Sequence, residues 1–176
     1  MLYYKLQEGG SIALEKKDLI IENTVLTNAK DKALKFLSYK ARTHKEVEEK
    51  LKDETYTDDV IEKVMDMLVK YNYINDHEYT KAYVRSKKNY GELKIKFELK
   101  NRGIKESLIT EVLADYNQRE RIVALFQKKL KGDTELCHKE KKRAFDYVAR
   151  RGFCYDDITS GFEDYKKLCC EEEDLF

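Results

Sequence analysis

The sequence predicts an all-α protein made of tandem three-helix repeats that form an elongated array. Composition is the first reason, because the 176 residues include no proline and only seven glycines, so little interrupts a helix. Hydrophobic residues make up 41% of the chain and charged residues 39%, which allows a core beneath a densely ionic surface. The second reason is a spacing of apolar residues that occurs three times.

That spacing is four, then nine, then four residues. It starts at Val47, again at Ile95, which is 48 residues later, and again at Phe145, after a further 50 residues. The three sets are Val47, Leu51, Val60 and Val64; Ile95, Leu99, Leu108 and Val112; Phe145, Ala149, Ile158 and Phe162. An amphipathic stretch precedes each set, at 33–37, 79–83 and 122–126. We therefore predict three helical repeats, each too small to complete a core without its neighbour.

The predicted organisation follows from these landmarks. It consists of an N-terminal appendage at 1–27, repeats at 28–75, 76–117 and 118–170, and an acidic tail at 171–176. In the appendage, short apolar runs flank two adjacent glycines, a weak signal for a hairpin or short strands. A partly disordered arm is the alternative for this segment.

Acidic residues stand at equivalent places in the repeats. Asp58-Asp59 and Asp156-Asp157 differ by the sum of the two repeat offsets, and Glu106-Ser107 holds the middle position. Paired carboxylates also suit metal or acid–base chemistry. The repeated position favours a structural role, in which acids open the third helix of each repeat and complement its dipole.

The sequence predicts no catalytic residue, no metal site and no cofactor. It contains no glycine-rich phosphate loop of the common kinds, and its three histidines fall in different repeats. The four cysteines form no CxxC pair, so we expect free thiols. No apolar run is long enough to span a membrane and no signal peptide is evident, so we expect a cytoplasmic protein. We also expect it to be a monomer.

Charge is distributed unevenly, although the net charge is only +1. From Thr80 to Lys105 there are nine basic residues against two acids, and from Arg119 to Arg151 eleven against five. Basic ridges of this kind can meet phosphates or an acidic protein surface, or they can simply be solvated. The candidate contact residues are Arg85, Lys87, Lys88, Tyr90, Lys94, Lys96, Lys100, Arg102, Lys141, Lys142, Arg143, Arg150 and Arg151.

Aromatic residues are interleaved with the middle basic zone. Tyr83, Tyr90 and Phe97 could stack on bases. For Tyr83 the apolar face that it shares with Tyr79 favours a core role, whereas Tyr90, beside a turn glycine, has no such explanation. Gly103 stands where a helix would end in a left-handed cap.

The same stretch resembles the central signature of the RecX family. The matching residues are Tyr73-Ile74-Asn75-Asp76, Tyr79, Tyr83-Val84, Lys87, Tyr90-Gly91, Ile95, Glu98-Leu99 and Gly103-Ile104. Two positions depart from the pattern, namely Asn75, where aspartate is frequent, and Glu92, where proline is common. The resemblance extends weakly over about residues 29–165.

This resemblance implies a non-enzymatic regulator built from tandem three-helix repeats. Its expected partner is the RecA recombinase in its filament on single-stranded DNA. The expected effect is modulation, chiefly inhibition, of the ATPase and recombinase activities of RecA, in DNA repair, homologous recombination and the SOS response. Two alternatives stay open on the residues alone. One is a helix-turn-helix-like module that binds single- or double-stranded DNA without RecA, and the other is a helical-repeat scaffold for another protein.

Overall fold

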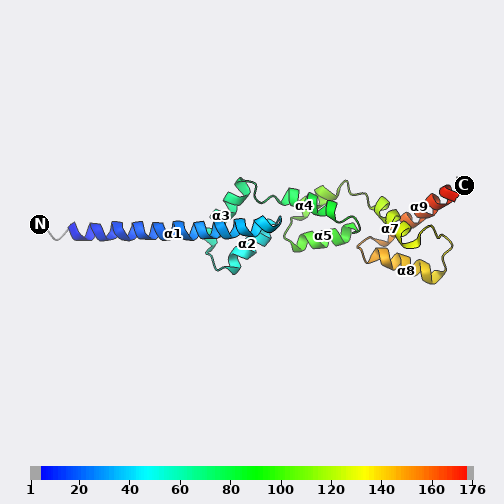
Figure 1. The fold of residues 1–176 in the computed structure, drawn as a ribbon, viewed down its shortest axis with the longest axis horizontal. Coiled ribbons are helices and arrows are strands. Elements are labelled where there is room, and N and C mark those ends of the chain that lie inside the picture. The colour runs from blue at the N-terminus through cyan, green and yellow to red at the C-terminus, as the bar shows by residue number, and fades with distance from the viewer. Residues whose placement is uncertain (1–4, 174–176) are drawn as a thin grey trace. The chain divides into compact units, whose positions relative to one another are not determined.

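A computed structural model describes the backbone of residues 5–173 and the side chains of residues 20–170. In this part the chain is helical between its turns and contains no strand, which confirms the all-α class (Figure 1). The helices are α1 (Lys5–Tyr39), α2 (His44–Asp53), α3 (Asp58–Lys70), α4 (Asp76–Ser86), α5 (Glu92–Asn101), α6 (Glu106–Leu113), α7 (Gln118–Leu130), α8 (His138–Ala149) and α9 (Tyr155–Glu173).

The prediction of strand character near the N-terminus is wrong for the residues described. Helix α1 runs without a break for 35 residues from Lys5 and passes through both glycines of the predicted hairpin. Glycine weakens a helix interior by about 1 kcal/mol per residue but does not block it as proline does. The boundary predicted after residue 27 falls inside α1, and residues 1–4 lie outside the described residues.

The chain forms two compact units, residues 1–76 and 77–176. In the first unit, the C-terminal half of α1 packs with α2 and α3 around Ala33, Val47, Leu51 and Leu68. Helix α2 begins with a capping box, in which Thr43 and Glu46 each accept the other's backbone N–H. These three helices make the first module.

The second unit contains two further three-helix groups. Helices α4–α6, the second module, enclose a small core that includes Ile95, Leu99 and Ile109. Helices α7–α9, the third module, enclose a larger aromatic core, where the Phe126 ring lies 5.2 Å from the Phe162 ring between centroids. The tandem arrangement of three-helix modules predicted from the apolar spacing is therefore confirmed.

Local geometry repeats with the modules. A residue with positive φ precedes the last helix of each one, namely Thr55 (63°), Gly103 (80°) and Gly152 (85°). The acids predicted to open these helices do so, with Asp58, Glu106 and Asp156 in the first turns of α3, α6 and α9. The positive-φ residues mark the same turn in each module, and the acids mark the same helix start.

One apolar landmark is misplaced by a single residue. Ala149 is exposed, and the adjacent Val148 fills the core of the third module together with Phe145. Leu108 and Val112 are half-buried, while their neighbours Ile109 and Leu113 are buried.

In the described residues, no helix combines the length and apolarity that a membrane crossing requires.

Candidate functional site

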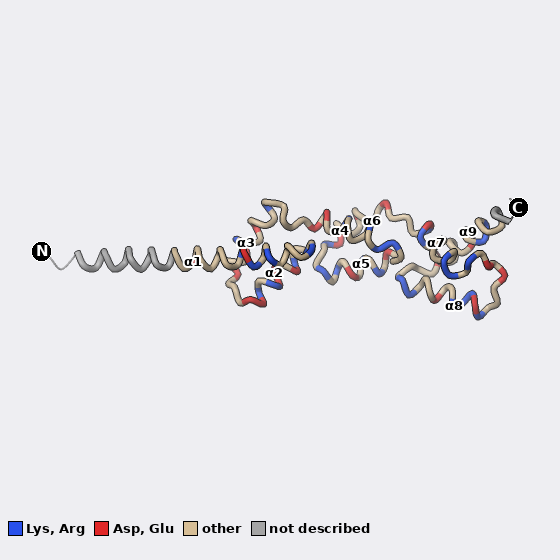
Figure 2. The backbone as a smooth tube through the Cα atoms, in the orientation of Figure 1, with Lys and Arg blue, Asp and Glu red and all other residues tan. Residues whose placement is uncertain are grey.

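The candidate residues fall in two places in the second unit. One set belongs to the end of α4, the α4–α5 loop, α5 and the C-cap residue of α5, and we call it the middle basic surface: Arg85, Lys87, Lys88, Tyr90, Lys94, Lys96, Lys100 and Arg102. Lys141, Lys142, Arg143, Arg150 and Arg151 belong to α8 and the residues after it, and we call this set the α8 cluster. Figure 2 shows basic residues along both segments, with few acids among them.

Tyr90 organises the loop of the middle basic surface. Its half-buried ring packs against the core of the second module. The Nζ atoms of Lys87 and Lys94 lie 5.0 and 4.2 Å from the ring centroid, so two ammonium groups share one aromatic ring. The sequence left Tyr90 unexplained, and its role in the structure is to hold these two cations at the surface.

Residues of the α6–α7 linker and of the first turn of α7 hold this loop in place. The Tyr116 hydroxyl donates to the carbonyl of Tyr90, and Nη1 of Arg121 donates to the carbonyl of Lys87 at 3.2 Å. The Arg121 guanidinium also lies 4.1 Å above the Tyr116 ring. Burial raises the pKa of Tyr116 above its usual value, so the phenol remains a protonated donor to a higher pH than an exposed tyrosine would.

Arg102 joins helices within the second module. Its Nη1 donates to the Tyr79 hydroxyl at 2.7 Å, and its guanidinium lies 5.3 Å from the centroid of Tyr83. The rings of Tyr79 and Tyr83 are stacked with centroids 6.2 Å apart, on the face that the sequence predicted them to share. Arg102 is therefore a structural contact as well as a candidate binding residue.

The remaining members differ in how free their charges are. Lys96 is ion-paired with Glu92, and Lys100 with Glu106 at 2.7 Å. Arg85 and Lys88 are exposed and have no ion-pair partner among the described residues. These two are the residues of the surface best placed to meet an anionic partner.

An exposed apolar pair lies on α5, of which only Phe97 was considered from the sequence, as an aromatic that could stack on bases. Leu93 is 58% exposed and Phe97 is 65% exposed, one helical turn apart. Both lie two residues from the buried Ile95, about 200° around the helix and hence on its outer side. The sequence carried this signal, because Ile95 and Leu99 define the core face and leave these side chains no core to enter.

Backbone contact between two glycines joins the second and third modules. The Gly91 N–H donates to the carbonyl of Arg151 at 2.7 Å, and the Leu93 N–H donates to that of Gly152 at 3.1 Å. A Cβ on Gly91 would overlap the carbonyl of Gly152, and one on Gly152 would overlap the Cβ of Lys94. This junction places Arg151 beside the first turn of α5.

Gln118 strengthens the junction. Its Oε1 accepts the Glu92 N–H at 3.2 Å, while its Nε2 donates to the carboxylates of Glu92 at 3.1 Å and Asp157 at 3.2 Å. A proline at position 92, the residue that the resemblance favours, could not donate the first of these bonds. The departure at Glu92 is therefore matched by a contact that only a residue with an N–H can make.

The structure divides the α8 cluster. Arg151 lies 3.6 Å above the Tyr147 ring and donates to the Tyr147 carbonyl at 2.6 Å, and Arg150 donates to the Asp146 carbonyl at 3.1 Å. Lys141, Lys142 and Arg143 lie on the first turns of α8 and are exposed. Arg151 belongs with the module junction, Arg150 contacts its own helix, and the other three residues form a separate basic patch.

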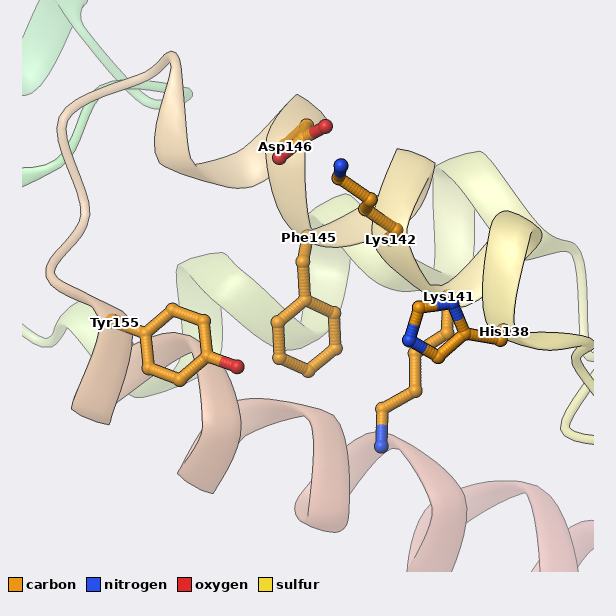
Figure 3. Close-up of a pocket in the computed structure, with 6 residues that line it drawn as sticks. All are labelled: His138, Lys141, Lys142, Phe145, Asp146 and Tyr155. Atoms are coloured by element: carbon orange, nitrogen blue, oxygen red, sulfur yellow. The ribbon is translucent and has the colours of Figure 1, made fainter.

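The described residues contain no group of three histidine, cysteine, aspartate or glutamate side chains arranged to hold a metal ion. A cavity of about 500 Å³ lies beside α8 and the start of α9, lined by His138, Lys141, Lys142, Phe145, Asp146 and Tyr155 (Figure 3).

Comparison with known proteins identifies relatives along most of the chain. The family model described as RecX, first three-helix domain, matches residues 29–68, and the model of the second three-helix domain matches residues 75–113. A regulatory protein RecX from Clostridium acetobutylicum is 30% identical, over 87% of this chain and 76% of that protein. One from Bacillus licheniformis is 36% identical, over 76% of this chain, which spans about half (53%) of that protein.

The fold is also similar to that of a solved relative. The crystal structure of RecX from Lactobacillus salivarius superposes with a TM-score of 0.73 at 27% sequence identity. The superposition covers 81% of this chain and 97% of the solved one. The two matched family domains coincide with the first and second modules, whose helices span residues up to 113.

Proposed function

This chain belongs to the RecX family of regulatory proteins, and from that premise we propose that it regulates the RecA recombinase. In this proposal it binds the filament that RecA forms on single-stranded DNA and inhibits its ATPase and strand exchange. It has no catalytic step of its own, and it acts in recombinational repair and the SOS response in the cytoplasm, where RecA filaments form. The observation that carries the proposal is the similarity to proteins named regulatory protein RecX over 87% of the chain.

The middle basic surface supports binding to a protein partner. Arg85 and Lys88 project free charges, and the exposed Leu93 and Phe97 lie on the adjacent helix. A protein interface combines an apolar or aromatic anchor with a charged rim, and both features are present here on neighbouring elements. The partner surface that fits has acidic groups around an apolar depression.

Regulation requires that this protein bind one state of RecA more tightly than another. The junction between the second and third modules supports such selectivity, because it holds the middle basic surface and Arg151 in one body. A body with fixed spacing between its contacts favours the filament geometry that matches that spacing. Occupation of the filament in this way would hinder the entry of duplex DNA and the addition of further RecA subunits.

The test is the DNA-dependent ATPase rate of RecA as this protein is added. We expect inhibition at molar ratios well below one per RecA. The variant Arg85→Glu/Lys88→Glu should require on the order of tenfold more protein for the same inhibition, because both changes replace free cations with anions. A matched control is Lys30→Glu/Lys35→Glu, which makes the same charge change at exposed positions of α1.

Three outcomes would count against the proposal. Inhibition only at concentrations that coat the DNA would favour a module that binds nucleic acid without RecA, and its salt dependence would be steep. An absence of any effect on RecA would favour a helical scaffold for another protein. An equal loss in the control variant would show that overall charge, rather than the middle basic surface, determines the effect.

A further inference from the structure

The cavity on the third module is lined by side chains that have no part in the contacts proposed for RecA. Figure 3 shows Tyr155 at the start of α9 facing Phe145 of α8, with His138 and Lys141 on the far side of the Phe145 ring. The cavity is thus an open hollow with aromatic rings along it and basic side chains at one end.

Tyr155 is the distinctive member of this group. It is 70% exposed, whereas the neighbouring Phe145 is 8% exposed and belongs to the core. The two ring centroids lie 5.9 Å apart at an angle of 55°, so one ring does not cover the face of the other. Among the described residues the Tyr155 hydroxyl has no hydrogen-bond partner. Its position therefore leaves a tyrosine face open toward solvent.

The basic groups of the cavity are free of ion pairs in the part of the chain that the structure describes. The Nζ atom of Lys141 lies 5.5 Å from the Phe145 centroid and 5.2 Å from that of Phe162. Lys142 carries a second charge, and Asp146 is the single acid in the lining. In Figure 3, Lys142 and Asp146 extend toward each other and away from the Tyr155 ring, so the acid does not face the aromatic part of the cavity.

We propose that this cavity binds single-stranded DNA, with one base stacked on Tyr155 and the adjoining phosphates at Lys141 and His138. An open aromatic face beside unpaired lysines is the combination by which proteins hold single strands, because every base offers a face for stacking. A duplex keeps its bases stacked on one another and cannot offer that face.

Two observations favour a strand over a free nucleotide or an acidic peptide. Lys139 and Arg143 are exposed on the same turns of α8, so the positive charge continues beyond the cavity along the path of a polyanion. The open ring of Tyr155 adds little to the binding of a carboxylate, which is recognised by charge and hydrogen bonds. A strand uses both the ring and the row of cations.

The sequence contains no tryptophan, so a tryptophan introduced in the cavity can be followed by fluorescence without any background from another one. The variant Tyr155→Trp carries a single tryptophan in the cavity, and its fluorescence is measured as oligothymidylate of about 15 nucleotides is added without RecA. We expect saturable quenching that weakens as salt is raised. A duplex of the same length, thymidine monophosphate, ATP and polyglutamate serve as the comparison ligands.

Substitutions separate the ring from general charge. Tyr155→Ala should weaken binding of the oligonucleotide by about tenfold or more, whereas Tyr155→Phe should keep most of the affinity because it keeps the ring. Tyr71→Ala is the matched control, since Tyr71 is 65% exposed and lies in the first unit. Lys141→Gln should lower the salt dependence of binding by about one ion, and Lys128→Gln on α7 provides its control.

Unchanged affinity in Tyr155→Ala, or an equal loss in Tyr71→Ala, would overturn the assignment. So would quenching by duplex, mononucleotide or polyglutamate in the same concentration range as by the oligonucleotide. Because RecA is absent from these titrations, their outcome is independent of whether this protein regulates RecA.

Discussion

Lys87, Tyr90 and Lys94 show how single residues shape the binding surface. Two ammonium groups near one ring each gain about 0.5–1 kcal/mol at an exposed site. The larger consequence is positional, because lysine side chains held on a ring lose less conformational freedom when they meet a ligand. The α4–α5 loop therefore presents its charges in a prepared arrangement.

Tyr165 has a comparable role in the third module, where it holds the loop between α7 and α8. Its hydroxyl accepts the Gly132 N–H and donates to the Asp133 carbonyl, both at 3.1 Å. We expect Tyr165→Phe to lower the free energy of unfolding by about 1–2 kcal/mol at neutral pH, measured by urea denaturation. Tyr155→Phe, which changes an exposed ring, should leave the free energy of unfolding unchanged. Equal effects of the two substitutions would contradict this role.

Because of Tyr165, the free energy of unfolding should depend on pH in the alkaline range. Burial raises the pKa of Tyr165 from 10.0 to about 12. The protonated phenol is thus favoured in the folded state, and its contribution to stability is complete below pH 10 and is lost between pH 10 and about 12. The other tyrosines titrate as well, so the quantity to measure is the difference between this protein and Tyr165→Phe. That difference should shrink across this pH range, and a constant difference would contradict the assignment.

Sequence patterns predicted some residue roles and missed others, for a physical reason. The stacking of Tyr79 on Tyr83 follows from helical spacing and was predictable. The bond from Arg102 to Tyr79 joins residues 23 apart in sequence, and no local pattern encodes it. The exposure of Phe97 was predictable from its place opposite Ile95, although the sequence alone does not show that the outer side of α5 is left uncovered by the third module.

Among the contacts between elements, the junction between α5 and the α8–α9 turn leaves the least room for a larger side chain. Gly91 has an ordinary φ of −82°, so its backbone conformation does not require glycine. The requirement comes from the approach of Gly152, which leaves no room for a Cβ. The junction therefore depends on two small residues that are 61 positions apart in the chain.

Substitution at this junction should separate the two modules locally. We expect Gly91→Ala to destabilise the second unit by about 2–3 kcal/mol, because the added Cβ forces the Gly152 carbonyl away from α5. Amide hydrogen exchange of the intact chain should show that the Leu93 N–H, which donates to Gly152, loses its protection.

Gly132→Ala is the control for this change. Gly132 has a φ of 94° and no atom within 4 Å of an added Cβ, so its substitution adds backbone strain of about 1–2 kcal/mol without any overlap. Protection of the Leu93 amide should persist in that variant. Retained protection in Gly91→Ala would show that the junction accommodates the added Cβ without losing its hydrogen bond, and would contradict the expected separation of the modules.

The starts of α3, α6 and α9 were the most predictable boundaries in the fold. The acids at these helix starts are local signals, and the sequence also marked Gly103 as a left-handed cap, whereas the positive φ of Thr55 and of Gly152 was not predicted. The extension of α1 was missed because a pair of glycines is a turn signal as well as a tolerated helix weakness. The junction was missed because backbone hydrogen bonds between modules do not produce a periodic pattern of residues in the sequence.

For the whole molecule, the two basic regions of the second unit have different proposed tasks. The middle basic surface combines free cations with an apolar pair and suits a protein partner. The cavity on α8 combines lysines with an open tyrosine and suits a DNA strand. A filament of protein on single-stranded DNA is a partner that offers both surfaces together.

Function was predictable from the sequence only through resemblance. The repeat spacing predicts stacked helical modules, and the basic zones suit either an anionic partner or a solvated surface, but neither feature distinguishes a recombinase from bare DNA or another protein. Similarity to known proteins identifies the family, and the cations held by Tyr90 together with the free charges of Arg85 and Lys88 suggest where this chain would bind.

The most direct test of regulation is a comparison of three affinities at one salt concentration. The ligands are the RecA filament on single-stranded DNA, the same strand without RecA, and RecA without DNA. We predict that this protein binds the filament at least about tenfold more tightly than either component, since a regulator of the filament must distinguish it from its parts. Equal affinity for the filament and for the bare strand would contradict the account and leave a DNA-binding protein in its place.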